Sequence, residues 1–122
     1  MQKSFTSQLT NKLSVMDEVV FGYLFGSYAR DEAGVNSDVD IALYLKSTDL
    51  DTQLQVNYEL SKLLKKDVDL VVLNSVKNIY LLENILNDGI VIKDDNKRFD
   101  FEVRSHHDIL DYKAFRKYID AA

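Results

Sequence analysis

The stretch FGSYARDEAGVNSDVDIALYL, residues 25–45, decides how the chain is expected to fold. From Asp38 onward apolar side chains alternate with a second set, which is the pattern of a strand with one buried face. The apolar face holds Val39, Ile41, Leu43 and Leu45, and the other face holds Asp38, Asp40, Ala42 and Tyr44. Two aspartates that point to the same side of a sheet repel each other, and a bound cation relieves that repulsion.

The segments before this strand predict a helix, a strand and a turn. We expect an amphipathic helix over residues 3–16 and a buried strand over 18–25 that ends at Gly26. A short helix is expected over residues 27–33, and Gly34 and Asn36 mark a turn. The apolar stripe of the first helix would consist of Phe5, Leu9, Leu13 and Met16.

After the strand, helical and strand patterns alternate again. A helix should begin near Thr48 and Asp51, which have capping-box spacing, and bury a stripe on one face. That stripe would consist of Leu50, Leu54, Tyr58 and Leu64. A buried strand is expected over 67–73, a helix over 75–88 that Gly89 ends, and a short strand over 89–93.

A terminal helix is expected to follow Asp94, with its apolar stripe at Phe99, Val103, His107, Leu110 and Ala114. Alternating helices and strands predict an α/β (α+β) fold, a small mixed sheet of about four strands covered by helices. The 122 residues fit a single domain, 1–122. The first two strands are joined by about a dozen residues, which suits a parallel crossover or an antiparallel pair.

Composition excludes several classes of protein. The net charge is −5, with 15 basic and 20 acidic side chains, so the chain lacks the basic balance needed to grip a nucleic-acid backbone. With no cysteine there is no disulfide, zinc–thiolate site or thiol nucleophile. No apolar run is long enough to span a membrane, and the N-terminus lacks the character of a signal peptide, so we expect a cytoplasmic protein.

The residue types in the opening stretch predict a site for a metal and a phosphorylated ligand. Asp38 and Asp40 offer only oxygen ligands, which favours Mg²⁺, and Mg²⁺ completes its shell with water and substrate phosphates. Gly26 lets the backbone approach a phosphate, and Ser27 adds a hydroxyl at the expected start of a helix. Arg30, one turn further on, carries a guanidinium that reaches the same anion, or it pairs with a neighbouring acid on the surface.

A third carboxylate would help to hold a second ion in a phosphoryl- or nucleotidyl-transfer site. Asp69 is the best candidate because it lies in another predicted strand, and Asp67 has the same parity and remains the alternative. Neighbouring His106 and His107 have no second cluster to form a metal site with, so they are expected on a helix surface. The tyrosines near the C-terminus, Tyr112 and Tyr118, are expected to pack rather than to accept a nucleotide.

These residues carry a resemblance. The segment GSYARDEAGVNSDVDIAL, residues 26–43, resembles the GSx10DxD signature of the DNA polymerase beta-like nucleotidyltransferase superfamily. The small size and the GSYAR form resemble the minimal nucleotidyltransferases, the MNT antitoxins of HEPT–MNT toxin–antitoxin pairs. The segment KKDVDLVVLN, residues 65–74, resembles the strand with the third catalytic aspartate, and LLENILNDGIVIKDD with RFDFE resembles the segment after that strand.

The resemblance implies a nucleotidyltransferase fold and transfer of AMP from ATP, with Mg²⁺ as cofactor and pyrophosphate as leaving group. The implied acceptor is a tyrosine hydroxyl of a partner HEPT toxin, which the modification neutralises. Gly26 and Ser27 would bind the triphosphate, with Arg30 beside them. Asp38 and Asp40 would hold the metals, and Asp69 would complete the second metal site and act as the base.

Two other functions remain open at this point. One is a nucleotidyltransferase for a small molecule such as an aminoglycoside, whose relatives usually carry an added domain for the acceptor. The other is an antitoxin that neutralises its toxin by binding alone. A template-directed polymerase is disfavoured because the sequence provides no basic groove.

Overall fold

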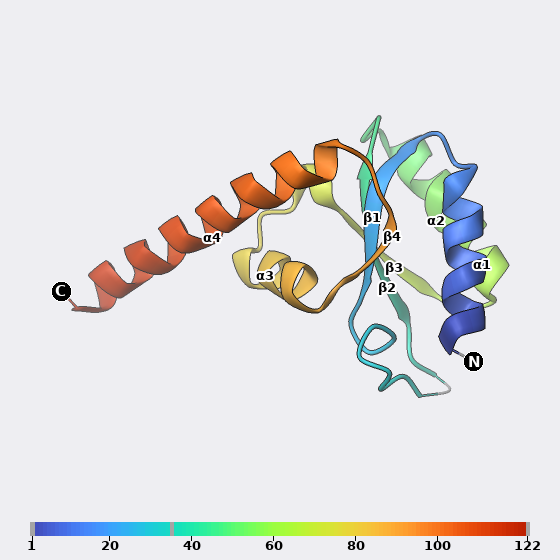
Figure 1. Cartoon of the computed structure of the whole chain (residues 1–122), viewed down its shortest axis with the longest axis horizontal. Coiled ribbons are helices and arrows are strands. Elements are labelled where there is room, and N and C mark those ends of the chain that lie inside the picture. The colour runs from blue at the N-terminus through green and yellow to red at the C-terminus, as the bar shows by residue number, and fades with distance from the viewer. Residues whose placement is uncertain (1, 35, 122) are drawn as a thin grey trace.

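The computed structural model describes residues 2–34 and 36–121 of the chain. In order, the elements of these residues are α1 (Gln2–Ser14), β1 (Val19–Phe25), β2 (Val39–Leu45), α2 (Leu50–Leu64), β3 (Val68–Val72), a 3₁₀ turn (Leu73–Ser75), α3 (Ile79–Asp88), β4 (Ile90–Lys93) and α4 (Lys97–Ala121). The strands form one sheet with helices on both sides (Figure 1). The predicted fold class, a small mixed sheet covered by helices, is therefore confirmed.

The sheet has the strand order β3-β2-β1-β4. The central strand β1 is antiparallel to both β2 and β4, whereas β2 and β3 are parallel. The connection that the sequence left open, between the first two strands, is therefore an antiparallel one. The parallel pair is joined through α2, the usual way of connecting neighbouring parallel strands.

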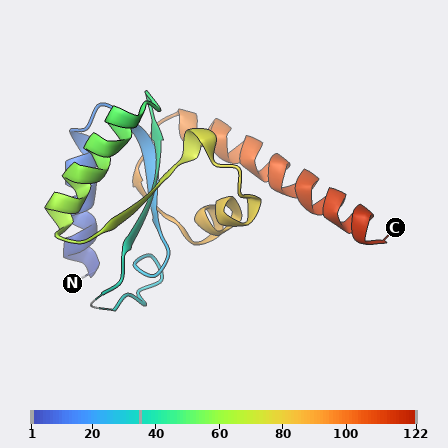
Figure 2. The same ribbon diagram turned by 180° about the vertical axis from the view of Figure 1, so that it is seen from behind.

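The sheet is the middle of three layers. Helices α1 and α2 cover one face, and α3 with the first part of α4 covers the other (Figures 1 and 2). The alternation of β2 sorts its side chains onto two faces, as predicted, and both faces contribute to cores: the first core takes Val39, Ile41, Leu43 and Leu45, and the second takes Ala42 and Tyr44. The predicted stripe of α1 is also confirmed, because Leu9, Leu13 and Met16 are buried and Phe5 packs against them.

The short helix expected over residues 27–33 is wrong. The chain forms a turn there, in which the amides of Ala29 and Arg30 both donate to the carbonyl of Gly26, at 3.1 and 3.2 Å. Asp31 then adopts a left-handed conformation, with φ +58°, which ends the turn. A single turn fixes many dihedral angles for few hydrogen bonds, so helical spacing over seven residues does not suffice to form a helix.

Helix α2 lies where the sequence predicted a helix, but its cap and its buried face differ. Asp49 caps it, accepting a 2.7 Å hydrogen bond from the amide of Thr52, in place of the expected pair Thr48 and Asp51. The buried face consists of Val56, Leu60 and Leu64, while the expected stripe members Leu50, Leu54 and Tyr58 are exposed. The helix carries apolar side chains on two faces, and the sheet covers only one of them.

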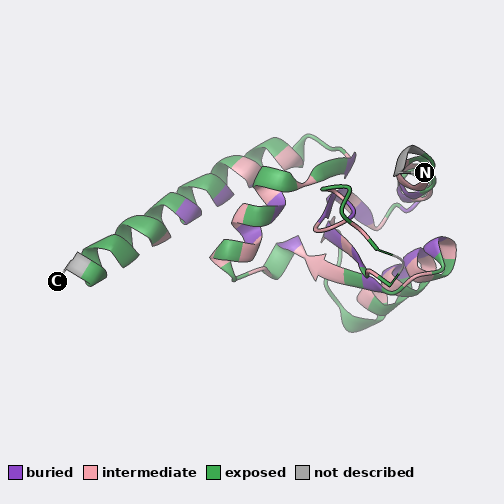
Figure 3. Ribbon diagram, turned by 90° about the horizontal axis from the view of Figure 1, so that it is seen from below, coloured by how far each residue is buried: buried purple, intermediate pink, exposed green. Residues whose placement is uncertain are grey.

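The stripe predicted for α4 is wrong for the same reason. Phe101, Ser105 and Ile109 face the rest of the chain and are buried. The expected stripe, Phe99, Val103, His107, Leu110 and Ala114, is exposed. Beyond residue 112 the helix extends past the body, and its residues 113–120 are exposed (Figure 3).

The strand predicted over residues 67–73 is present but lies at an edge of the sheet, so only Val68 of β3 is buried. Helix α3 begins at Ile79, later than the expected residue 75, because Asn78 accepts hydrogen bonds from the amides of Tyr80 and Leu81 and so caps it there. Gly89 ends α3 as predicted, and its amide donates a 2.8 Å hydrogen bond to the carbonyl of Ile85.

Candidate active site

The topology gathers the predicted site residues at one end of the sheet. Because β1 and β2 are antiparallel, the end of β1 and the start of β2 lie side by side, with Phe25 opposite Asp40. Because β2 and β3 are parallel, their starts also coincide, with Asp40 opposite Asp69. The turn after β1 and the aspartates of both strands therefore meet at the lower end of the sheet in Figure 1.

Gly26 is required at its position for two reasons. Its φ is +72°, a conformation that residues with a Cβ rarely adopt. A Cβ on this residue would also lie 2.2 Å from Oδ2 of Asp40, well inside van der Waals contact. The backbone of the turn therefore approaches the Asp40 carboxylate as closely as it does only because residue 26 is a glycine.

The predicted helix N-terminus at Ser27 is absent, so the anion-binding argument from a helix dipole does not hold here. Ser27 is half-buried in the turn, and its carbonyl accepts a 2.8 Å hydrogen bond from the amide of Glu32. Of the groups predicted to bind phosphate, the turn still offers its backbone amides and the Ser27 side chain.

Asp40 is the most perturbed carboxyl of this cluster. Partial burial, followed by the charge of Asp69, a hydrogen bond with Asp69 and the charge of Asp38, raises the pKa of Asp40 above its usual value. The positive charge of Arg30 opposes this shift. Carboxylates held this close destabilise one another until a cation binds, so the cluster suits a hard divalent ion.

Asp69 and Asp67 differ in how they relate to Asp40. Asp69 acts on Asp40 through both charge and hydrogen bonding. Asp67 is exposed and contributes its backbone to the ladder, with its carbonyl accepting a 2.9 Å hydrogen bond from the amide of Val39. The register therefore places Asp69, rather than Asp67, directly beside Asp40.

The donor set fits a magnesium ion in its chemistry, since it offers carboxylate oxygens only. Asp38 and Asp69 are exposed and Asp40 is half-buried, so water and a phosphate have access to all three. Among the described residues, however, no three acidic, histidine or cysteine side chains already stand close enough to form a complete ligand group. Some ligands would then come from water and from substrate phosphates, as is usual for Mg²⁺.

Arg30 lies at the rim of the site and forms the surface ion pair with a neighbouring acid that was one of the two interactions considered for it. Its Nε donates a 3.1 Å hydrogen bond to Oε2 of Glu32, and both side chains are largely exposed. Its charge also acts on Asp40. An exposed ion pair of this kind contributes little to stability, and anion binding by Arg30 remains a prediction.

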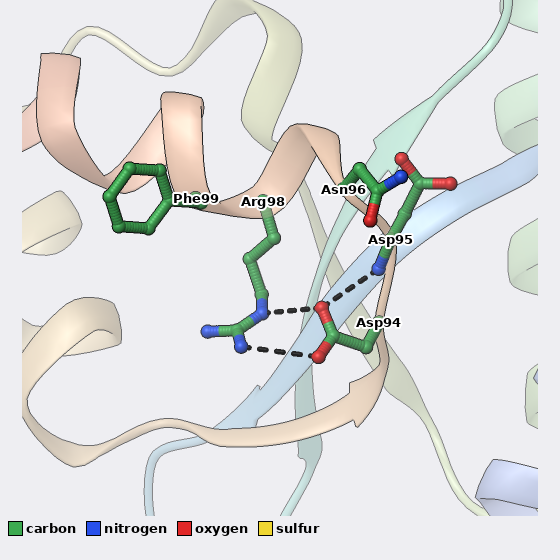
Figure 4. Close-up of a pocket in the computed structure, with 5 residues that line it drawn as sticks. All are labelled: Asp94, Asp95, Asn96, Arg98 and Phe99. Carbon is green, nitrogen blue, oxygen red and sulfur yellow. Dashed lines mark hydrogen bonds and ion pairs between the residues drawn. The ribbon is translucent and has the colours of Figure 1, made fainter.

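A hollow of about 410 Å³ lies elsewhere, at the start of α4 (Figure 4). It is lined by Asp94, Asp95, Asn96, Arg98 and Phe99. The Arg98 guanidinium is held by Asp94, with Nε donating to Oδ1 at 2.7 Å, while Phe99 points away from this pair. The strand pairing places this hollow at the opposite end of the sheet from Gly26, so it is no part of the aspartate cluster.

One residue that holds β2 in place was missed in the sequence. The Asn74 side chain accepts a 2.9 Å hydrogen bond from the amide of Leu45 and donates a 2.8 Å hydrogen bond to its carbonyl. The side-chain amide of Asn74 therefore makes the hydrogen bonds that the backbone of a neighbouring strand would make at the end of β2. An asparagine just after a predicted strand is common in loops, so no sequence signal distinguished it.

The fold and the site define a class of protein. The family model of polymerase beta nucleotidyltransferases matches residues 7–98, and the chain belongs to that family. The predicted resemblance and the predicted enzyme class, a nucleotidyltransferase, are therefore confirmed. The roles assigned to individual residues remain predictions.

Within this family, the chain is similar to proteins linked to AMP transfer. It is 40% identical over 70 residues, 57% of this chain and 71% of the relative, to "Putative protein adenylyltransferase MJ0126" of Methanocaldococcus jannaschii. It also matches a chain in the crystal structure of a toxin–antitoxin with AMP-PNP, with a TM-score of 0.78, 27% identity and 95% of both chains covered.

A further similar structure contains a tri-AMPylated Shewanella oneidensis HEPN toxin in complex with MNT antitoxin. The TM-score is 0.71 and the identity is 26%, with 99% of this chain and 97% of that chain covered. These two structural matches extend over nearly the whole fold. In the described part of the chain, none of the helices is long and apolar enough to cross a membrane.

Proposed function

We propose that the chain is an antitoxin that transfers AMP from Mg²⁺–ATP to a tyrosine hydroxyl of a HEPT-type (HEPN) toxin. The observation that carries the proposal is the cluster of Asp38, Asp40 and Asp69 beside a glycine turn that contacts Asp40 directly. Similar structures that contain an ATP analogue or an AMPylated HEPN toxin support the choice of nucleotide and partner.

In the proposed reaction, the tyrosine oxygen attacks the α-phosphorus of ATP. A bond forms between that oxygen and the phosphorus, and the bond between the α-phosphorus and the bridging oxygen breaks, so that pyrophosphate leaves. The phenolic proton passes to Asp69, an exposed acceptor beside Asp40. A tyrosine with an ordinary pKa near 10 needs such a base at neutral pH.

The chain's own residues have separate tasks. The backbone around Gly26 and the Ser27 hydroxyl bind the triphosphate, and Arg30 adds a positive charge at the rim of the site. Asp38 and Asp40, with Asp69, would hold Mg²⁺, which supplies positive charge against the developing charge on the phosphates. Asp40 belongs to β2 and is half-buried, so the strand holds it in position.

A protein acceptor suits this molecule better than a small-molecule acceptor. Exposed apolar side chains occur along the helix that projects from the body, including Phe99, Leu110 and Phe115. Large exposed apolar side chains that gather on one element are typical of protein-binding surfaces. A small-molecule acceptor would instead require a closed pocket at the aspartates.

The test is the intact mass of a purified HEPT-type toxin after incubation with this chain, Mg²⁺ and ATP. We expect the toxin to gain one or more AMP units. With Asp38→Ala and Asp40→Ala combined, the rate should fall about a hundredfold or more, because neither carboxylate at the start of β2 remains to hold the ion. Lys46→Ala, just after β2 at the end of this strand opposite Asp40, is the control and should leave the rate unchanged.

Two results would contradict the proposal. If the toxin gains no mass but still forms a tight complex and loses its toxicity, the chain neutralises it by binding alone. If AMP appears on an aminoglycoside in a parallel assay and not on the toxin, the chain is a small-molecule nucleotidyltransferase.

A further inference from the structure

Behind the glycine turn lies an aromatic stack that the proposed reaction does not use directly. Tyr28, the residue after Ser27, is buried and points into the core between the sheet and α1. Its ring stacks on Phe5 of α1, with centroids 4.8 Å apart and planes 16° from parallel. On the same tyrosine, the Nζ of Lys66 lies 5.9 Å from the ring centroid, within cation–π range.

The stack joins three segments that are distant in the sequence. Phe5 belongs to α1, Tyr28 to the turn that contains Gly26 and Ser27, and Lys66 to the connection just before β3. Lys66 directly precedes Asp67, whose carbonyl pairs with the start of β2. The stack therefore connects the turn on one side of the aspartates with the strand that carries Asp69 on the other.

Short-range backbone hydrogen bonds also hold the turn. The amides of Ala29 and Arg30 donate to the carbonyl of Gly26, and the amide of Glu32 donates to the carbonyl of Ser27, but no helix continues from the turn in the described residues. Gly26 itself lacks a side chain that restrains it. The buried ring of Tyr28, next to Ser27, adds a restraint from the core that these local hydrogen bonds do not supply.

We propose that Tyr28 is a positioning residue, which acts through Gly26 and Ser27 to keep the turn in the shape that receives the triphosphate. The inference rests on the proposed function, since it assumes that the turn binds nucleotide. The ring does not touch the ligand. It acts by reducing the number of conformations of the turn before the nucleotide binds, which lowers the cost of binding.

The experiment measures the dissociation constant for α,β-methylene-ATP with Mg²⁺ by titration calorimetry on the full chain. The bond that nucleotidyl transfer would break is replaced in this analogue, so binding is separated from chemistry. Tyr28→Leu should weaken binding about five- to tenfold, which is the scale of one stacked aromatic contact. Tyr28→Phe keeps the ring and should bind within about twofold of the wild type.

A matched control separates positioning from general loss of stability. Phe101 is as buried as Tyr28, at 7% against 8% exposure, and contacts the rings of Phe21 and Tyr44 at tilted and edge-on angles in the second core. Phe101→Leu should lower the Tm by a similar amount and leave the dissociation constant unchanged. Phe5→Leu removes the stacking partner but keeps Tyr28, and should weaken binding in the same direction about two- to threefold.

The outcomes are distinct. The inference is wrong if Tyr28→Leu binds the nucleotide as tightly as the wild type does. It is also wrong if Phe101→Leu weakens binding as much as Tyr28→Leu does. Either result would leave the proposed function intact. Failure of the wild-type chain to bind the analogue would refute the proposed function, and the inference with it.

Discussion

At the scale of single residues, the carboxylates expected to bind a cation lower the stability of the folded chain without one. Asp40 is partly buried and lies near two further carboxylates, those of Asp69 and Asp38. Burial and these neighbouring charges both raise the pKa of Asp40. The folded chain thus binds a proton on Asp40 more tightly than the unfolded chain does. Its free energy of unfolding falls as the pH rises from the ordinary value of 3.8 through the raised pKa of Asp40, and stays lower above it.

The first prediction concerns this linkage. Asp40→Asn should raise the Tm of the metal-free protein by a few degrees at pH 7, because it removes a half-buried charge that repels Asp69 and Asp38. The gain should shrink as the pH falls below the raised pKa, where Asp40 is already protonated. Differential scanning calorimetry at pH 4 and pH 7 measures both effects. A loss of stability at pH 7 would show that Asp40 is stabilised by interactions that asparagine cannot make.

The second prediction concerns Gly26. Gly26→Ala should destabilise the fold by about 1–3 kcal/mol, because the added Cβ meets the Asp40 carboxyl and the backbone is left-handed. It should also abolish nucleotide binding, since either the turn or Asp40 has to move. Urea denaturation and the calorimetric titration provide the two readouts. Gly34→Ala is the matched control: its Cβ would have its nearest neighbour at 3.8 Å, so a small effect is expected.

At the scale of elements, the start of α4 is held on the sheet by a polar network. The Tyr23 hydroxyl on β1 donates a 2.6 Å hydrogen bond to Oε2 of Glu102, and Arg98 donates a 2.7 Å hydrogen bond to the same oxygen. Burial and Glu102 raise the pKa of Tyr23, so it remains a neutral donor across the physiological range. The network therefore links the first turns of α4 to β1.

The third prediction tests this network. Tyr23→Phe should lower the free energy of unfolding by about 1–2 kcal/mol, because a buried hydrogen bond to a charged group is lost while Arg98 still pairs with Glu102. AMP transfer should change little, because Tyr23 lies away from the aspartates along β1. Tyr80→Phe removes an exposed hydroxyl and should leave stability unchanged. Equal effects of the two substitutions in urea denaturation would show that the Tyr23 hydrogen bond contributes nothing.

At the scale of the whole molecule, the fold has a body and a projecting helix. The three-layered body contains both cores, whereas residues 114–120 of α4 are all exposed (Figure 3). An isolated helical end is only marginally stable in water. The body, rather than this extension, therefore determines the stability of the chain.

The fourth prediction concerns this division. A chain that ends after Lys113 should keep its Tm within about 2 °C of the full chain, because residues 114–120 are exposed. Lys113 is kept because it forms an ion pair with Glu83 of α3. Thermal unfolding followed by circular dichroism is the measurement. A large fall in Tm would mean that the extension folds back on the body in solution.

Much of this molecule is determined by local sequence. The alternation over residues 38–45 specifies a strand, and both of its faces became cores. The spacing of Gly26, Ser27 and the two aspartates predicted one site, and the structure places Gly26 against Asp40, while the roles of these residues stay predictions. Gly89 likewise ends α3, since its local conformation is sufficient to stop a helix.

The tertiary structure decided which apolar faces are covered and which distant residues meet. Helices α2 and α4 each carry apolar side chains on more than one face, and only the position of the sheet selects the face that is buried. The stack of Phe5, Tyr28 and Lys66 joins three separate segments. The pairing of Asp40 with Asp69 depends on the parallel register of two strands that are separated by a whole helix. Periodicity describes one element at a time, whereas burial and register are properties of elements packed together.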